Sequence, residues 1–410
     1  MDKLKKVNEY IKNSWHKSVR KNDADPDFVM PYAYTSPCIP GKEGAFIHLY
    51  YWDTYFINKG LYADGLEKYA FGNIEDLKFS LRKFGCVPNM CKEFGAKFAS
   101  QPPLLVFMVD DYYEFSKNKA FLADSYEALK TEYKFWMEKR ISPTGLNRWG
   151  CNLDYRKVIP KDENVYFNKR TGQKVVGTWE DIIRCYENNL AQGESGQDNT
   201  QRYMMRAAEI NAVDLNSYLY GFEKTMAKFA CILGEKDIEW LEKAENRKIL
   251  MDKYLLDEST GIYFDYIFTD GKRTGIYCVD NYTPFIFGIS NDKQVVEKIN
   301  DILIKEHGVV STAIPSKNGE NYQWGYPNAW APHQYWSYMA NIKVGNTNKA
   351  REIATKYLNT VADEFLISGT LYEKYDAVNG GKSVVNEYGV PEMLGWTAGI
   401  YEYFYKEFHE

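Results

Sequence analysis

Helical periodicity recurs along most of this chain and limits the fold more than any other feature. The clearest segment begins at Asp214, a plausible N-cap residue, continues with one apolar stripe and ends at Gly234. Shorter segments with the same periodicity occur at about 66–83, 104–118, 122–139, 239–255, 292–306, 329–342, 347–362 and 391–407. Gly, Pro and Asn separate them, so the sequence predicts an all-α fold in which helix follows helix.

Two regions depart from this pattern without changing the fold class. The stretch 261–268 resembles a strand, and 147–177 is a long polar insertion, but neither offers the alternation of a parallel α/β fold. No Gly/Ser-rich or Pro-rich linker divides the chain, and 45% hydrophobic residues can fill a large core. We therefore expect residues 1–410 to form one domain of repeated helical hairpins with long loops.

Charge and cysteine usage argue against several functions. The net charge is −5, so we expect no nucleic-acid partner. No apolar run approaches the roughly 20 residues of a membrane helix, and the N-terminal stretch lacks a signal core, which predicts a soluble, cytoplasmic protein without membrane contact. The seven cysteines form no Cys-x-x-Cys pair, and the five histidines are isolated. We expect neither a metal site nor another cofactor.

Aromatic residues are unusually frequent, at 16% of the chain. Rings with polar tips suit the apolar C–H faces and hydroxyls of sugars, although much of this aromatic mass must be ordinary packing.

Four polar and aromatic clusters stand out, and we expect them in connections between helices. The first cluster, Leu49–Phe56, holds Asp53 among rings, where it is either a ligand-binding carboxylate or a helix cap. The second cluster, Gly193–Arg202, holds Glu194 and Asp198, but such stretches also occur as plain turns.

The other two clusters lie near the C-terminus. The third cluster, Tyr322–Pro332, is rich in rings and amides, as a sugar platform or a structural turn would be. The fourth cluster comprises Leu371–Asp376, Asn386–Tyr388 and Gly395–Thr397, with the acids Glu373, Asp376 and Glu387. Glycosidic cleavage needs paired carboxylates. No Ser/His/Asp order, phosphate loop or metal spacing offers an alternative chemistry.

Taken in chain order, these blocks resemble the trehalases of glycoside hydrolase family 37 and their relatives in family 63. The matching blocks are Tyr51–Phe56, Val87–Asn89, Ser100–Pro103, Glu194–Asp198, Asp214–Leu219, Gln323–Trp324, Pro327–Pro332, Glu373–Asp376, Glu387–Tyr388 and Gly395–Thr397. The resemblance implies an (α/α)6 toroid and an inverting mechanism, with Asp198 as general acid and Glu373 as general base. It also implies a substrate pocket that we expect to contain Tyr50, Trp52, Asp53, Asn89, Gln101, Gln323, Trp324, Trp330, Glu387 and Trp396.

The chain departs from the trehalase pattern at two arginines that help to hold the two glucose units in the family. Ala45 and Ala99 stand at these positions. We therefore expect hydrolysis of small α-linked glycosides or oligosaccharides, with α-glucosides favoured and α-mannosides possible. The alternatives are a trehalase proper, a phosphorylase or epimerase on the same toroid, and a non-catalytic carbohydrate-binding protein.

Overall fold

A computed structural model describes residues 3–21, 28–41, 46–169, 171–315, 322–384 and 391–409. Its α-helices are α1 (Lys3–Lys12), α2 (Trp15–Ser18), α3 (Tyr51–Ala63), α4 (Glu67–Phe84), α5 (Glu93–Ala96), α6 (Leu105–Ser116), α7 (Lys119–Lys139), α8 (Trp179–Ser195), α9 (Val213–Leu233), α10 (Ile238–Tyr254), α11 (Thr283–Ile286), α12 (Lys293–Leu303), α13 (Ala331–Lys343), α14 (Thr347–Ser368) and α15 (Gly395–His409).

Short 3-10 helices and strands connect these helices. The 3-10 helices are η1 (Tyr155–Lys157), η2 (Gln201–Tyr203), η3 (Ala207–Glu209) and η4 (Val279–Tyr282). The strands are β1 (Val19–Arg20), β2 (Tyr34–Thr35), β3 (Val165–Phe167), β4 (Lys174–Val176), β5 (Ile210–Asn211), β6 (Leu256–Asp257), β7 (Ile262–Tyr263), β8 (Tyr266–Ile267), β9 (Lys272–Arg273), β10 (Asn328–Trp330) and β11 (Lys374–Asp376). All their pairings are antiparallel.

The contacts between helices define two concentric rings. In the inner ring, α3 contacts α6, and the contacts continue through α9, α11 and α13 to α15, which packs back on α3. The outer helices α4, α7, α10, α12, α14 and α1 each contact at least one inner helix. Inner and outer helices alternate along the chain, so the predicted (α/α)6 toroid is confirmed.

The two rings differ in how their helices are buried. The outer helix α14 buries one stripe, which includes Ile353, Tyr357 and Val361, as an amphipathic helix does. The inner helices α3 and α15 are buried on several sides and approach closely. A Cβ atom at Gly60 would lie 2.6 Å from the Cα atom of Gly399, so the contact requires glycine. This packing closes the inner ring.

Most predicted helices are present, but three details differ. The predicted N-cap at Asp214 is wrong: Ala212 is the N-cap of α9, and the carboxylate of Asp214 instead pairs with Arg202 at 2.7 Å. The predicted helix 329–342 begins only at Ala331, because Asn328–Trp330 pair with β11. The first cluster lies largely inside α3 rather than in a connection, because a helix buried on most sides shows no apolar stripe.

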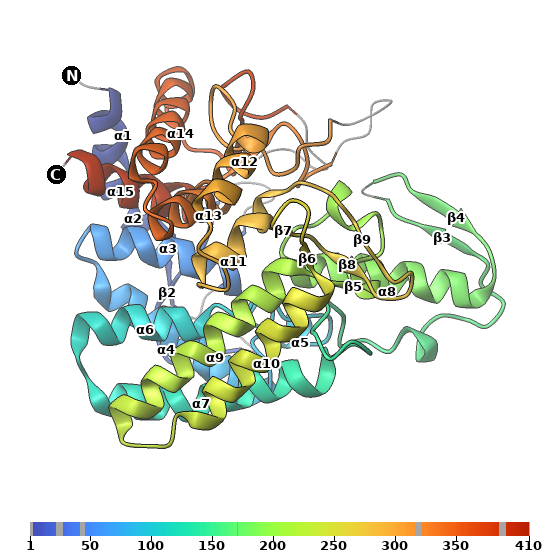
Figure 1. Ribbon diagram of the computed structural model, residues 1–410. Helices are drawn as coiled ribbons and strands as arrows, with labels where there is room; N and C mark the ends of the chain where they lie inside the picture. Colours follow the sequence, from blue (N-terminus) through green and yellow to red (C-terminus); the bar gives the residue numbers. More distant parts are fainter. Residues whose placement is uncertain are drawn as a thin grey trace.

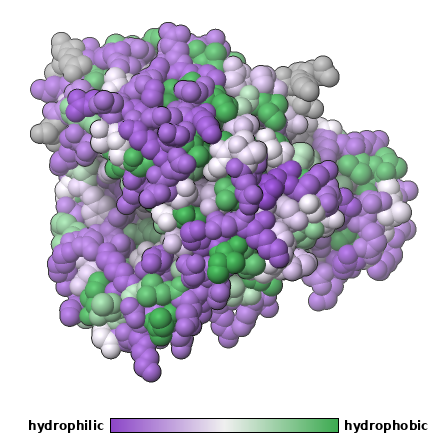
Figure 2. All heavy atoms as spheres, viewed as in Figure 1, coloured by the Kyte–Doolittle hydropathy of each residue, from purple (hydrophilic) through white to green (hydrophobic). Residues whose placement is uncertain are grey.

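The polar insertion forms a lobe that projects from the rings and contains η1, β3, β4 and the start of α8 (Figure 1). Figure 2 shows hydrophobic residues on this lobe, where Phe167 is 53% and Val176 68% exposed. Within the described residues, no helix is both long and apolar enough to cross a membrane.

Candidate active site

The loop that carries Asp198 follows α8 and is fixed from both sides. Helix α8 ends at Ser195, and its C-cap residue, Gly196, has a φ of 75°. A Cβ atom at Gly196 would lie 2.6 Å from the Trp52 ring. The Gln197 side-chain amide donates to Asp280 at 2.8 Å, and the Thr200 hydroxyl donates to the backbone carbonyl of Trp324 at 2.9 Å. Asp198 itself is partly exposed. The loop therefore joins the first, second and third clusters.

A two-stranded ribbon joins the third cluster to the fourth. In the pairing of β10 with β11, Trp330 lies opposite Lys374, directly after Glu373. The Gln323 side-chain amide donates to the Glu373 carboxylate at 3.3 Å, and its oxygen accepts a hydrogen bond from the Lys374 ammonium at 2.8 Å. The Trp396 indole N–H donates to the backbone carbonyl of Glu373 at 3.0 Å. Lys374 thus fixes the Gln323 amide, and this amide faces Glu373.

The first turn of α3 supplies Trp52 and Asp53. The side-chain oxygen of Gln101 accepts a hydrogen bond from the backbone N–H of Trp52 at 3.1 Å, one of the N–H groups that a helix start leaves unpaired. Asn89 donates to the backbone carbonyl of Gly193, next to the acid loop, at 3.3 Å. Gln101 and Asn89 therefore connect the helix start with the segments around it.

Four tryptophans converge between these segments. Trp324 stacks on Trp330 with 3.7 Å between ring centroids and an angle of 5°. Trp52 lies 5.4 Å from Trp324 and 6.0 Å from Trp396. All four are buried, and Trp330 has no exposed surface. The four rings pack into one buried aromatic cluster, in which each ring covers part of the surface of its neighbours.

The charges of three predicted site residues interact. The pKa of Asp53 rises from its ordinary value of 3.8 to about 8, mainly because the side chain is buried, and also because the charges of Glu373 and Asp198 act on it. Desolvation also raises the pKa of Cys38 to about 12, with further contributions from Glu373 and Asp53. The charges of Glu373 and Asp198 therefore both act on Asp53.

Two buried ion-pair networks hold the second cluster in place. Arg202 contacts Asp214, Asp265 and Asp280, each at 2.7 Å, and all four side chains are buried. Its charge is therefore directed at these three carboxylates. Arg140 binds Glu194 at 2.6 Å, and Glu194 also accepts a hydrogen bond from the Ser100 backbone N–H at 3.0 Å. Glu194 is therefore a structural partner of Arg140.

Other residues from the clusters have different positions. Tyr50 is the N-cap of α3, and its pKa is raised by burial and by the charge of Asp53. Asp376 accepts hydrogen bonds from the backbone N–H groups of Val378 and Asn379 at 2.8 and 2.9 Å, so it stabilises its own turn. Glu387 and Ala45 lie outside the described residues.

Two further residues of this region are not among those predicted from the sequence. Cys38 lies near the carboxylates, and Asp280 binds both Arg202 and Gln197. A signal existed only for Asp280, which is a charged residue in the apolar stretch 276–286.

We expect Asp53→Asn to change stability in a pH-dependent way. Because the folded-state pKa of Asp53 is raised, its contribution to stability is full below about pH 4 and is lost as the pH rises toward 8. The asparagine side chain stays neutral at every pH. Between about pH 4 and 8, the free energy of unfolding of the variant should therefore rise relative to that of the wild type by up to about 1.4 kcal/mol per pH unit. Denaturant unfolding of both proteins from pH 4 to 9 measures this difference. If the difference in unfolding free energy between the two proteins does not vary with pH, the raised pKa of Asp53 is contradicted.

Comparisons with known proteins agree with the fold. A family model described as Trehalase matches residues 1–409. Human trehalase is 28% identical in an alignment over 407 residues, and the match covers 91% of this chain and 67% of the human protein. Trehalase from Oryctolagus cuniculus gives the same three percentages in an alignment over 403 residues.

Two solved structures show the same architecture. Neutral trehalase Nth1 from Saccharomyces cerevisiae superposes with a TM-score of 0.76 at 22% identity, covering 98% of this chain and 80% of the other. A family 63 mannosylglycerate hydrolase from Thermus thermophilus gives 0.68 at 13% identity, covering 97% and 99%.

The toroid and its carboxylate site, together with these relatives, define a glycoside hydrolase. The family model spans nearly the whole chain, and the protein belongs to the trehalase family.

Proposed function

We propose that this protein hydrolyses α-glycosidic bonds with inversion of the anomeric centre. Asp198 protonates the glycosidic oxygen, and Glu373 removes a proton from the water that attacks the anomeric carbon from the opposite face. The observation that carries the proposal is the electrostatic interaction of Asp53 with both Glu373 and Asp198. It supports one shared site, although the two carboxylates come from loops 175 residues apart in the sequence (373 − 198).

The surroundings of Glu373 suit a general base. Such a base must stay ionised, and the Gln323 amide donates a hydrogen bond to its carboxylate. Lys374 acts through Gln323, because its ammonium holds the amide oxygen and so directs the NH2 group toward Glu373. We therefore propose supporting roles for Gln323 and Trp330, which have no exposed surface.

The remaining candidates have roles at the sugar. Asp53 lies in the first turn of α3 among the aromatic residues. We propose that it binds hydroxyls of the non-reducing-end sugar, beside Trp52, Trp324 and Trp396. Glu387 stays a proposed neighbour of the attacking water. The pocket roles predicted for Tyr50, Asn89 and Gln101 stay proposals of the same kind.

The human and rabbit relatives are named trehalases, so trehalose is the first substrate to test. The arginine that the trehalase pattern places before Ser100 is replaced by the buried Ala99. Two arginines near the second cluster, Arg140 and Arg202, are already bound to buried carboxylates. Neither guanidinium is therefore free to replace the sugar contact of the arginine that stands at position 99 in the trehalase pattern. We therefore propose an α-glucoside with a different leaving group as the best substrate, with α-mannosides as the second class.

We expect trehalose to be hydrolysed with a kcat/KM at least about tenfold below that of the best α-glucoside or α-mannoside. Each lost hydrogen bond from a charged group costs about 1.5–3 kcal/mol, and a tenfold change corresponds to about 1.4 kcal/mol. A panel of α-linked disaccharides and glycosyl-glycerates, assayed for released sugar, measures this ratio. If trehalose proves the best substrate, the leaving-group proposal is wrong. If no glycoside in the panel is cleaved, the hydrolase proposal itself fails.

A further inference from the structure

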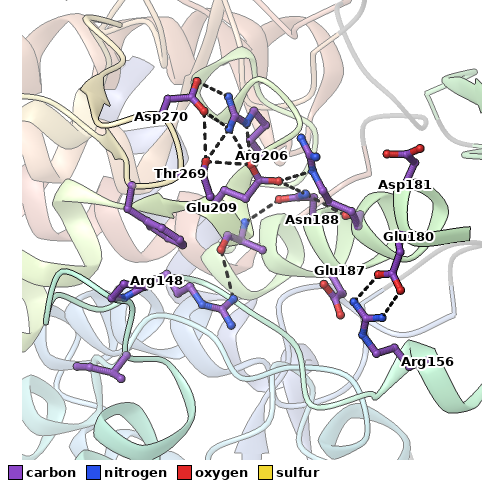
Figure 3. A pocket seen from close by; sticks show the side chains of 15 residues that line it. Arg148, Arg156, Glu180, Asp181, Glu187, Asn188, Arg206, Glu209, Thr269 and Asp270 are labelled. Carbon is purple, nitrogen blue, oxygen red and sulfur yellow. Dashed lines mark hydrogen bonds and ion pairs between the residues drawn. The ribbon is translucent and has the colours of Figure 1, made fainter. Parts of the chain in front are cut away.

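A cavity lies away from the proposed active site, beside the first half of α8 (Figure 3). Its volume is about 670 Å³, within the range of small-molecule sites. Glu187 lines it, whereas Asp198 follows the other end of the same helix. From Glu187 to the last residue of α8, Ser195, the helix rises by roughly 12 Å at 1.5 Å per residue. The lining shares no residue with the proposed catalytic site.

Most charged side chains around this cavity neutralise one another. Arg156 pairs with Glu180 at 2.7 Å, and Arg184 pairs with Glu209 at 2.6 Å. A third arginine, Arg206, pairs with Glu209 and Asp270, both at 2.7 Å. Figure 3 shows the pairs of Arg156 and Arg206 on different sides of the cavity. Asp181 is bound to Thr178 in the capping box of α8. These groups form a polar rim in which each charge has a partner of opposite charge or a hydrogen-bond partner.

Arg148 and Glu187 are the charged lining residues that remain. Arg148 donates only to the backbone carbonyls of Trp149 and Ala208, at 3.2 and 3.3 Å and both from Nη1, and has no carboxylate within 4 Å among the described residues. A guanidinium has five N–H donors, so most of its donors have no protein acceptor in that part of the chain. Glu187 likewise has no hydrogen bond or ion pair within the described ranges.

Partial burial makes it energetically unfavourable for Arg148 and Glu187 to lack hydrogen-bond partners. Partial burial lowers the pKa of Arg148, and the nearby positive charge of Arg140 lowers it further. Partial burial also raises the pKa of Glu187, while Arg156 and Arg148 lower it. Both are only partly exposed. A ligand that offers an acceptor to Arg148 and a donor to Glu187 would satisfy both groups.

The charge balance selects the kind of ligand. Four arginines face five carboxylates, so the cavity has no positive excess to hold a phosphate or another polyanion. A sugar hydroxyl both donates and accepts hydrogen bonds, so two hydroxyls of one ring can serve Arg148 and Glu187 without adding charge. The half-buried ring of Phe268 also lines the cavity and offers an apolar surface for the C–H face of a pyranose.

We propose that this cavity is a second saccharide site, which binds an uncharged pyranose through Arg148, Glu187 and Phe268, separate from the site of hydrolysis.

Amide hydrogen exchange read by mass spectrometry tests the proposal, because it reports on the two sites separately. The full-length protein is titrated with D-glucose, and exchange is followed in peptides covering 141–148 and 266–270 for the cavity. Peptides covering 50–56 and 371–376 report on the proposed active site. We expect slower exchange in the cavity peptides as the sugar saturates the site. Protection of the active-site peptides alone would overturn the cavity proposal without affecting the proposed hydrolysis.

Two variants and one control variant localise the effect. Arg148→Met and Glu187→Gln each remove one hydrogen-bonding partner of the sugar. We therefore expect the D-glucose concentration that gives half-maximal protection of the cavity peptides to rise at least about tenfold in each variant. Lys157→Met changes a neighbouring lysine whose side chain is 81% exposed and should bind like the wild type. Unchanged protection in both cavity variants overturns the proposal. So does protection by glycine or inorganic phosphate when D-glucose gives none, because the cavity would then bind a charged ligand.

Discussion

Asp198→Asn is expected to lower turnover of natural α-glycosides by about 10²–10⁴-fold, the usual contribution of a positioned acid or base. The loss should be much smaller for a glycosyl fluoride, because fluoride leaves with little protonation. The residue is partly exposed and lies between Gln197 and Thr200, whose hydrogen bonds hold the loop. Asparagine keeps the size of the side chain and removes only the acid, so binding should be largely kept.

Glu373→Gln should lower turnover of both substrates by a similar factor, because water must be activated whichever group leaves. The two variants control for each other: only the acid variant should respond to the leaving group. Turnover of one α-glycoside and one glycosyl fluoride, with the anomer of the first product read by NMR, measures all of this. Near-wild-type rates for Glu373→Gln, or a retained anomer, would refute the assigned base, and Glu387 would become the first alternative.

Arg202→Met is expected to lower the free energy of unfolding by about 3–5 kcal/mol, the cost of breaking a buried ion pair on one side. The substitution leaves Asp214, Asp265 and Asp280 buried together without their shared cation. Burial raises the pKa of Asp214 to about 6, although the charge of Arg202 lowers it. Burying this carboxylate in its charged form therefore costs free energy even when Arg202 is present. Urea unfolding of both proteins at neutral pH measures the loss.

Two controls separate buried charge from general damage. Arg82→Met breaks an ion pair with Asp124 whose side chains are 48% and 51% exposed, and should cost at most about 1 kcal/mol. Adding Asp265→Asn and Asp280→Asn to Arg202→Met should recover part of the loss, because fewer unpaired charges remain buried. If Arg202→Met is as stable as Arg82→Met, the three carboxylates do not need the guanidinium's charge.

Structural elements with local signals can be predicted from the sequence alone. The apolar stripe of α14 and the end of α9 at Gly234, where φ is 79°, both depend on residues within one or two helical turns. Both can therefore be predicted from the sequence. The order of the polar and aromatic blocks was enough to suggest the toroid and its family. It also pointed to Asp198, Glu373 and Asp53, whose charges interact in the folded chain.

The partners of the charged residues depend on tertiary contacts that the sequence does not reveal. Asp214 looked like a helix cap, but a guanidinium twelve residues earlier binds it (214 − 202). Lys374 is adjacent to Glu373 in sequence, yet its ammonium donates hydrogen bonds to Gln323, and it acts on the base through that amide. Along a strand, adjacent side chains point to opposite faces, so sequence proximity does not set contact. A buried charge must be paired, and the available partner depends on which segments the closed ring brings together.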